Sequence, residues 1–499
     1  MGICSGLRVN GAGHLEMGGV DLAVLAKRMG TPLYVLDESF IRAQCRRYRE
    51  AFTQNYPHWD VAYASKALSN RALVSIMHQE GLSLDVVSGG ELHTAVTAGF
   101  PPERIYFHGN NKSDEEIALG LDYGVGRFVV DSAIELEVLG RLAAARGRNA
   151  AILIRVRPGI EAHCHHYVQT GTTDSKFGVS LREAAHLARS AARSGVLAVK
   201  GIHCHIGSQI LETKPFEAAS SVMVQTLVRV RSEIQRQTGA AFAARDLPDE
   251  LSLGGGLGVA DATGQRPPSI EDYVKSLCRT VKEEWRKAHP GDAGDGSYAS
   301  AQLPRIIIEP GRSIINGAGV TLYTVGGTKL SGNRRNYVFV DGGMGDNPRP
   351  ALYGARYTAA LANRAGEAPE TEYRVVGKCC ESGDVLIEQA GMPRAHRGDI
   401  LVTFGTGAYN YSMASNYNRL PRPAMVLVRD GKWDVIVKRE TFEHLTALDV
   451  VPPRLHAWAW PGAAERTGGL GGQPSCCGGE HGMLDSENGV AGRAVGLTR

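Results

Sequence analysis

The amino-acid sequence predicts an α/β protein: a (β/α)8 barrel of the TIM type followed by an all-β C-terminal domain of the sandwich or barrel kind. Three observations carry this prediction. Between residues 61 and 312, short apolar runs rich in β-branched residues alternate with helical stretches eight times, which is typical of βαβ units with parallel strands. Eight units in a stretch of this length match a closed barrel, for which about 250 residues are typical. Beyond residue 312, short strands separated by turn residues replace the helical stretches.

The eight barrel strands are expected at 61–64, 82–87, 104–107, 127–130, 151–156, 199–204, 251–253 and 305–308. Polar residues lie at or directly after nearly all of their ends: Lys66, Asp85 with Ser88, His108 to Asn110, Asp131, Arg157, His205, Gly254 to Gly256, and Glu309 with Arg312. The carboxyl ends of barrel strands converge on one mouth, so these residues are expected to be neighbours. An open doubly wound sheet is the alternative, but it would place its ligand at one switch point and leave most of these residues unexplained.

The C-terminal domain is expected to contain strands at 320–325, 337–340, 373–376, 385–388, 400–404, 424–428 and 434–437. Asp430-Gly431 is typical of a hairpin turn. An apolar strand at 31–36 precedes the barrel and could pair with this domain. The predicted division is an N-terminal segment 1–37 that contributes a strand to the β-domain, a barrel 38–312, the β-domain 313–452, and a disordered Gly-rich tail 453–499.

Composition excludes several classes of function. Lys and Arg number 55 and Asp and Glu number 52, which leaves a net charge of +3; this balance indicates neither a nucleic-acid partner nor an acidic membrane surface. No apolar stretch is long enough to span a bilayer, and the N-terminus lacks the pattern of a signal peptide. The 9 cysteines show no C-x-x-C spacing, which indicates free thiols in a reducing compartment. We therefore expect a cytoplasmic protein with a small-molecule partner.

Lys66 closes the first apolar run and precedes a helical stretch from Ser69 to Glu80. A lysine held in a low-dielectric site loses its proton more easily and becomes a nucleophile that can form a Schiff base. A strand-end lysine that reaches into solvent is the alternative, and Lys66 alone does not decide between them.

Two late segments indicate a ligand with a phosphate and a heterocycle. The run from Gly254 to Gly258 follows a strand, and successive glycines let backbone N–H groups approach a phosphate; a tight turn is the alternative. Its spacing fits neither a dinucleotide fingerprint nor a nucleotide P-loop. Glu309-Pro310-Gly311-Arg312 ends the last barrel strand. The glutamate could face a heterocyclic nitrogen and the arginine an anion, or the two could form a local salt bridge.

Histidines gather in His203-Cys204-His205 and in the segment 163–166. The first pair shares one face of a strand. Zinc is one interpretation, but no carboxylate joins either group at ligand spacing. We therefore predict no metal, and an imidazole that stacks on an aromatic cofactor. Cys380 and Tyr409 follow strands of the β-domain, where a buried cysteine and a structural tyrosine are the ordinary alternatives.

Together these segments resemble the fold-type-III pyridoxal-phosphate decarboxylases, from about Gly11 to Val450. The shared motifs, in the family's order, are Tyr63-Ala64-Ser65-Lys66, the run from Asp85 to Leu92, Ser175-Lys176-Phe177-Gly178, the run from His203 to Gln209, Gly254-Gly255-Gly256, Glu309-Pro310-Gly311-Arg312, the run from Arg349 to Tyr353, the run from Cys380 to Asp384, and Gly407-Ala408-Tyr409. Nine motifs in one order are specific. The sequence departs from the family in Cys379, which precedes the usual cysteine, and in the tail beyond Pro453.

The resemblance implies that pyridoxal 5′-phosphate is the cofactor and that Lys66 carries it. His205 would stack on the ring, and Glu309 would keep the pyridine nitrogen protonated. Asp85, Ser208, Gly255, Gly256, Gly311, Arg312 and Tyr409 would complete the cofactor site. The substrate would meet Arg312, Arg349, Tyr353, Glu381 and Tyr409, and Cys380 would return a proton to the product. In the family the segment of Cys380 and Glu381 enters a neighbouring subunit's barrel, which implies a homodimer with active sites at the subunit interface.

The resemblance also implies the reaction, decarboxylation of meso-2,6-diaminopimelate to L-lysine and CO2, the last step of lysine biosynthesis. The far end of this substrate is itself an amino acid, so it offers a carboxylate to an arginine and an ammonium to a glutamate. One alternative is a decarboxylase of ornithine, arginine or carboxynorspermidine, which the run from Arg349 to Tyr353 and Glu381 disfavour. A catalytically inactive regulatory homologue is a remoter alternative, because such proteins typically lose the lysine or the phosphate ligands.

Overall fold

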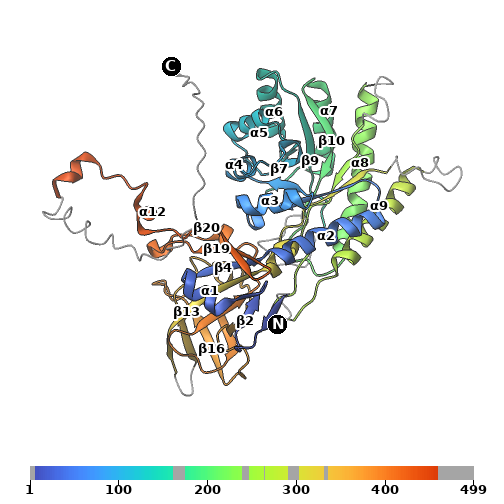
Figure 1. Cartoon of the computed structure of the whole chain (residues 1–499). Helices are drawn as coiled ribbons and strands as arrows, with labels where there is room; N and C mark the ends of the chain where they lie inside the picture. The colour runs from blue at the N-terminus through green and yellow to red at the C-terminus, as the bar shows by residue number, and fades with distance from the viewer. Residues whose placement is uncertain are drawn as a thin grey trace, which may run out of the picture. The chain divides into compact units, whose positions relative to one another are not determined.

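The computed structural model describes residues 6–160, 175–238, 247–262, 264–289, 303–330 and 335–458. Residues 1–445 belong to one compact unit and 446–499 to a second. The first unit contains both the barrel and the β-domain (Figure 1). Of the predicted tail, residues 453–458 form a short 3-10 helix, and 459–499 lie outside the described residues.

Eight parallel strands close into the predicted barrel. They are β5 (Trp59–Ala64), β6 (Ser83–Val86), β7 (Ile105–Phe107), β8 (Arg127–Val130), β9 (Ala150–Arg155), β10 (Leu197–His203), β11 (Glu250–Ser252) and β12 (Arg305–Ile308). β12 pairs with β5 and completes the circle. Each strand overlaps a predicted one, which confirms the barrel and excludes the open sheet.

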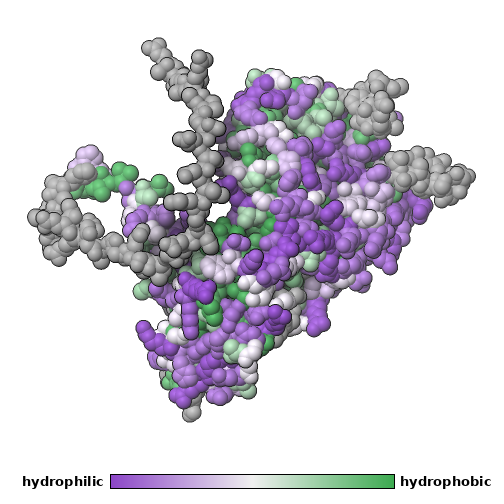
Figure 2. All heavy atoms as spheres, in the orientation of Figure 1, coloured by the Kyte–Doolittle hydropathy of each residue, from purple (hydrophilic) through white to green (hydrophobic). Residues whose placement is uncertain are grey.

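Helices cover the outside of the barrel: α2 (Glu38–Asn55), α3 (Arg71–Gln79), α4 (Gly89–Thr97), α5 (Asp114–Tyr123), α6 (Ala133–Ala145), α7 (Leu181–Arg193), α8 (Lys214–Thr238), α9 (Ile270–Ala288) and the short α10 (Arg312–Ile315). Serine side chains cap the first turns of five of them: Ser88, Ser113, Ser132, Ser180 and Ser269. Each cap satisfies a backbone N–H that has no partner within its helix. The outward faces of α2 and α9 are hydrophilic (Figure 2), as expected for amphipathic helices against a buried sheet.

A small apolar layer fills the barrel interior. It consists of Ala62, Tyr106, Val129, Leu153 and Ile307, all at most 4% exposed. Side chains alternate across a strand, so the residue two positions further along faces the same way and lies nearer the mouth. For four of the five strands that residue is polar: His108, Asp131, Arg155 and Glu309. The pleat of the barrel therefore delivers these polar side chains to its mouth.

The β-domain is built on β13 (Gly319–Lys329), β14 (Asn336–Val340), β15 (Ala359–Leu361), β16 (Thr371–Val376), β17 (Val385–Met392), β18 (Ile400–Phe404), β19 (Ala424–Arg429) and β20 (Lys432–Val437). β4 (Leu33–Asp37) pairs with β13 and with β19, which confirms that the strand before the barrel belongs to this sheet. Asp430 and Gly431 have φ of 50° and 75° and join β19 to β20, which confirms the hairpin turn.

Several short elements are absent from the sequence prediction. They are β1 (Leu7–Val9), β2 (Leu15–Met17), β3 (Val20–Asp21), α1 (Leu22–Met29), β15, α11 (Arg349–Tyr353) and α12 (Phe442–Thr446). Six of these seven elements are only two to five residues long and α1 has eight, and outside the repeating pattern of the barrel such short elements show too little periodicity to be recognised. Among the residues that the structure describes, no helix has both the length and the apolar character needed to cross a bilayer.

Candidate active site

A cavity of about 360 Å³ lies at the mouth of the barrel. It brings together eight of the predicted residues: Lys66, His205, Ser208, Glu309, Arg312, Arg349, Tyr353 and Tyr409. The barrel supplies the first five, and the β-domain supplies the last three. Other residues complete the wall: Val87, His108, Gly109, Asn110, Arg155, Phe177, His203 and Met413. One cavity therefore draws on both parts of the first unit.

Lys66 follows β5 in a short 3-10 turn, Ser65–Ala67, and its Nζ lies 3.2 Å from Oδ2 of Asp85. Asp85 is fully buried. Burial disfavours the ammonium, but the carboxylate of Asp85, with Tyr409 and Glu309, outweighs it and raises the pKa of Lys66. The expectation that a low-dielectric site makes this lysine lose its proton more easily is therefore wrong, because its nearest charged neighbour is an anion. The Lys66–Asp85 pair holds the ammonium at one place in the cavity.

The glycines after β11 leave no room for side chains. A Cβ on Gly254 would lie 2.4 Å from the carbonyl oxygen of Cys204, and one on Gly255 would lie 2.0 Å from that of Glu309. Gly254 also has a φ of 67°, which L side chains rarely adopt. The backbone here therefore packs closely against the neighbouring strand ends, as a phosphate cradle requires. Gly255 donates its N–H to Nδ1 of His205 at 3.2 Å, which fixes the imidazole at the edge of this loop.

Arg312 supplies a positive charge beside the glycines. Its Nη2 donates to Oγ of Ser208 at 3.2 Å, and its guanidinium lies 4.7 Å from the ring centroid of Tyr409. Its buried Nε has no hydrogen-bond partner within the described part of the chain. Burial, reinforced by the nearby Arg349, lowers the pKa of Arg312 to about 10, so the group is still a cation at neutral pH. A buried cation with an unused donor fits an anionic group such as phosphate.

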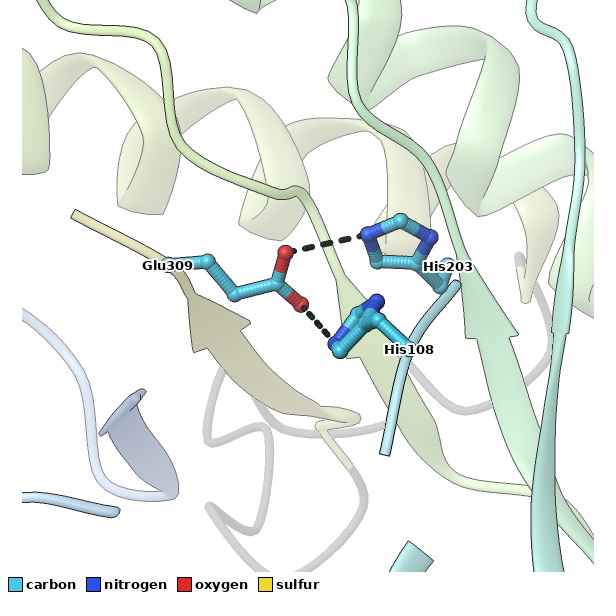
Figure 3. Close-up of side chains that lie close together, drawn as sticks. All are labelled: His108, His203 and Glu309. Atoms are coloured by element: carbon cyan, nitrogen blue, oxygen red, sulfur yellow. Dashed lines mark hydrogen bonds and ion pairs between the residues drawn. The ribbon is translucent and has the colours of Figure 1, made fainter. Parts of the chain in front are cut away.

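Glu309 is held by three side chains, of which His108 and His203 are drawn in Figure 3. Oε2 lies 3.1 Å from Nε2 of His203, Oε1 lies 3.3 Å from Nε2 of His108, and Ser252 donates its hydroxyl to Oε1 at 2.7 Å. Burial opposes the charge, but these neighbours lower the pKa of Glu309 well below its ordinary value. Burial lowers the pKa of His203 to about 4, so this imidazole is a neutral hydrogen-bond donor. Glu309 is therefore an ionised carboxylate suited to a protonated heterocycle.

His108, His203 and Glu309 are also the group of potential metal ligands found among the described residues, with ligand atoms within 4.8 Å of one another. Their separations are those of hydrogen bonds and ion pairs. The second predicted histidine group, 163–166, lies outside the described residues. His203 and His205 both line the cavity, as their shared strand face predicted. Burial lowers the pKa of His205 well below its ordinary value, so its ring is neutral.

Arg349 and Tyr353 lie on α11, at the β-domain side of the cavity. The guanidinium of Arg349 is 5.2 Å from the ring centroid of Tyr353 and 5.6 Å from that of Tyr409. Within the described residues, neither Arg349 nor Arg312 forms an ion pair with a carboxylate. Of the three arginines that line the cavity, Arg312 and Arg349 therefore present guanidinium groups that have no carboxylate partner among the described residues. Arg155 lines the cavity but was not predicted, although it lies two positions after Leu153 and faces the same way. Arg157 was predicted at the mouth instead, and its guanidinium donates to the carbonyl of Ser175.

Cys380 and Glu381 lie away from this cavity. Both side chains are exposed, and the backbone N–H of Cys380 donates to Oδ1 of Asn418 at 2.7 Å. The buried Asp384 fixes the loop, because its two oxygens accept the N–H groups of Met344 and Cys379, each at 2.7 Å. Asp384 thus joins the loop of Cys380 to the segment that leads into α11. Asp85, Gly255, Gly256 and Gly311, which were also predicted for the site, are not among the residues that line the cavity.

Comparisons with known proteins agree with this geometry. Residues 38–316 match the family described as pyridoxal-dependent decarboxylase, pyridoxal binding domain. The chain is 46% identical over 445 residues to the diaminopimelate decarboxylase of Bacillus subtilis (strain 168), covering 89% of this chain and 97% of that protein. It is 43% identical over 457 residues to that of Synechocystis sp. (strain ATCC 27184 / PCC 6803 / Kazusa), covering 90% and 92%.

Solved structures show the same relationship. The crystal structure of diaminopimelate decarboxylase from M. jannaschii in co-complex with L-lysine matches with a TM-score of 0.80 and 32% identity, over 91% of this chain and 100% of that chain. The lysine/ornithine decarboxylase from Vibrio vulnificus complexed with putrescine matches with a TM-score of 0.66 at 22% identity, over 82% and 97%; this likeness shows the fold alone.

A barrel enzyme that uses pyridoxal 5′-phosphate to decarboxylate an amino acid is thus the class that the fold, the cavity and the matched domain define. The glycine cradle and the free donor of Arg312 fit the phosphate, and Glu309 fits the ring nitrogen. Within that class, the identities of 40–46% to curated relatives decide the family. The chain belongs to the diaminopimelate decarboxylase family.

Proposed function

We propose that the protein decarboxylates meso-2,6-diaminopimelate to L-lysine and CO2, with pyridoxal 5′-phosphate as cofactor, as the last step of lysine biosynthesis. One observation carries the choice of substrate: Arg312 and Arg349 face one cavity without a carboxylate partner among the described residues. The cofactor's phosphate accounts for one guanidinium. The second requires another anion, which the distal carboxylate of diaminopimelate supplies and ornithine does not.

The barrel residues would hold the cofactor. Lys66 would bind it covalently, Asp85 would lie beside the lysine nitrogen, which its carboxylate approaches to 3.2 Å, and His205 would stack on the ring. Glu309 would face the pyridine nitrogen. The phosphate would lie among Ser208, Gly255, Gly256, Gly311, Arg312 and Tyr409. The bound cofactor supplies an electron sink for the pair of electrons that remains when the carboxylate leaves as CO2.

The substrate's far end would lie against Arg349 and Tyr353, near Arg312 and Tyr409. Glu381 would bind the distal ammonium, and Cys380 would return a proton to the product. Both residues are exposed and lie outside their own chain's cavity, which supports their insertion into a neighbouring barrel. We therefore propose a homodimer whose active sites form at the subunit interface.

Mixed dimers test this arrangement. Lys66→Ala and Cys380→Ala are each expected to be inactive, because one loses the cofactor lysine and the other the proton donor. A mixed dimer would contain one site with both natural residues, so random mixing should restore up to about a quarter of wild-type activity. A mixture that stays inactive while heterodimers form would contradict the shared site.

Steady-state kinetics test the substrate. CO2 release from meso-2,6-diaminopimelate should exceed release from ornithine or arginine, because a site with an unsatisfied arginine discriminates strongly against substrates that lack a carboxylate. Comparable efficiency on ornithine or arginine would favour the alternative decarboxylases. Absence of turnover on all of these substrates, with cofactor bound, would favour the inactive regulatory homologue.

We also propose the domain division 1–37, 38–312, 313–452 and 453–499. The pairing of β4 with the β-domain supports the first segment, and the family match at 38–316 supports the second. A cytoplasmic location is supported by the free cysteines at 45, 204, 278, 379 and 380, since a reducing compartment keeps thiols unpaired.

A further inference from the structure

One imidazole lies between the two carboxylates of the barrel mouth. His108 follows β7 and is 3% exposed. Its Nε2 lies 3.3 Å from Oε1 of Glu309 and 3.8 Å from Oδ1 of Asp85. Asp85 in turn pairs with Lys66 through its other oxygen, 3.2 Å away. A continuous row of charged and polar groups therefore runs from Lys66 through Asp85 and His108 to Glu309.

The row matters because both carboxylates are buried, with exposed fractions of 0% for Asp85 and 4% for Glu309. Two like charges taken out of water disfavour each other's ionised form unless a donor or a cation lies between them. Neither Oδ1 of Asp85 nor Nε2 of His108 has a hydrogen bond within the described residues, and the two atoms lie 3.8 Å apart, at ion-pair distance. The backbone fixes the position of His108, because its N–H donates to the carbonyl of Val86 at 2.8 Å.

The second imidazole serves a different oxygen. His203 approaches Oε2 of Glu309, and its ring packs edge-on against that of His108, with centroids 4.8 Å apart and planes at 72° (Figure 3). Ser252 also reaches Glu309. Loss of His108 would therefore leave Glu309 with its hydrogen bonds to His203 and Ser252, but it would remove the imidazole that lies 3.8 Å from Oδ1 of Asp85. His108 is thus the member of the group that joins the two carboxylates.

We propose that His108 is a positioning residue that couples the two ends of the cofactor site, by holding Asp85, the partner of Lys66, and Glu309 at fixed positions on either side of its Nε2. This inference rests on the proposed role of Glu309 toward the ring nitrogen. His108 itself need not touch the substrate. Its replacement should therefore change how the cofactor is bound and how fast CO2 is lost, more than how well the substrate binds.

The test compares His108→Leu with His108→Gln. Leucine preserves apolar volume and removes the donor, whereas glutamine keeps an N–H near the position of Nε2. In His108→Leu, the Kd for pyridoxal 5′-phosphate, measured by titration of the apoenzyme, should rise by roughly tenfold to a hundredfold, as expected for the loss of a charge-assisted contact. The absorbance maximum of the bound cofactor should shift, and kcat should fall by a similar factor while KM changes by less than about threefold. In His108→Gln, the Kd for the cofactor, its absorbance maximum and kcat should all stay close to their wild-type values.

Two further variants make the outcome unambiguous. Glu309→Gln shows how the spectrum responds when the carboxylate itself is lost, and His93→Gln, on the exposed face of α4, is the matched control that should behave as wild type. If His108→Leu does not fold, His108→Asn replaces it, since its shorter amide keeps polarity without spanning both carboxylates.

The results distinguish the proposed role of His108 from the proposed role of Glu309. Two outcomes would overturn the inference. One is an equal loss of cofactor affinity and kcat in His108→Leu and His108→Gln, because the size of the side chain alone would then matter. The other is a His108→Leu variant with the affinity and spectrum of wild type. If Glu309→Gln changes the spectrum while His108→Leu does not, only the role of His108 fails. If Glu309→Gln leaves both spectrum and affinity unchanged, the proposed role of Glu309 fails, and this inference fails with it.

Discussion

Replacement of Arg349 by alanine tests the substrate assignment most directly. The side chain lies on α11, half-buried in the cavity wall, and its guanidinium is within 6 Å of the ring centroids of Tyr353 and Tyr409, at 5.2 and 5.6 Å. Loss of one partner of a buried charge pair costs about 2–5 kcal/mol. Because Arg349 is half-buried, we take the middle of that range, about 3–4 kcal/mol, which corresponds to roughly two to three powers of ten in kcat/KM.

The structure also indicates what Arg349→Ala should leave unchanged. Arg349 is one of the causes, after burial, that lower the pKa of Arg312. Without it that pKa should rise, and Arg312 is a cation at neutral pH in either case. Affinity for pyridoxal 5′-phosphate should therefore be retained, and activity toward lysine and ornithine should stay low in both proteins.

The assay is steady-state release of CO2 from meso-2,6-diaminopimelate, ornithine and lysine, with cofactor affinity measured separately. Arg141→Ala is the matched control, since Arg141 pairs with Asp114 on the surface, with 60% of its side chain exposed. Such pairs contribute about 0–1 kcal/mol, so this variant should match wild type. A kcat/KM for diaminopimelate within about threefold of wild type, or a parallel loss of cofactor affinity, would refute the role of Arg349.

Four further predictions rest on the same structure. Lys66→Ala should abolish turnover, and borohydride reduction of the wild-type holoenzyme with peptide mapping should place the cofactor on Lys66; a label on another lysine would contradict the assignment. Asp384→Ala removes the acceptor of two backbone N–H groups, so urea unfolding should show a loss of about 2–4 kcal/mol, more than for Asp384→Asn. Burial raises the pKa of Asp346 from 3.8 to about 7, so the neutral acid stabilises the fold and this contribution is lost as the pH rises through that range. The Tm of Asp346→Asn minus the Tm of wild type should therefore increase as the pH rises from 4 to 7. A difference that stays constant over this range would show that Asp346 does not titrate there. Deletion of 456–499 should leave Tm and kcat/KM nearly unchanged, since that sequence offers no periodic apolar face.

The architecture could be predicted because its signals are local. Eight apolar runs, each followed by a helical stretch, indicate parallel strands, and Asp430-Gly431 defines its hairpin through the φ angles of two residues. The same locality placed eight of the predicted side chains in one cavity, because barrel closure brings strand ends together. The three-residue strand β15 lies outside this repeating pattern and carries no such signal, and its partner β18 provides its hydrogen bonds.

What the sequence by itself determined, then, was the barrel, the β-domain and the chemical types of the residues at the mouth. The tertiary structure decided their charges and partners. Lys66 is kept protonated by Asp85, which lies 19 positions away in the chain, against the expectation from burial alone. His108 lies between two carboxylates that come from other strands. The physical reason is that helices and strands depend on the nearest residues in the chain, whereas the pKa of a side chain depends on charges a few ångströms away in space.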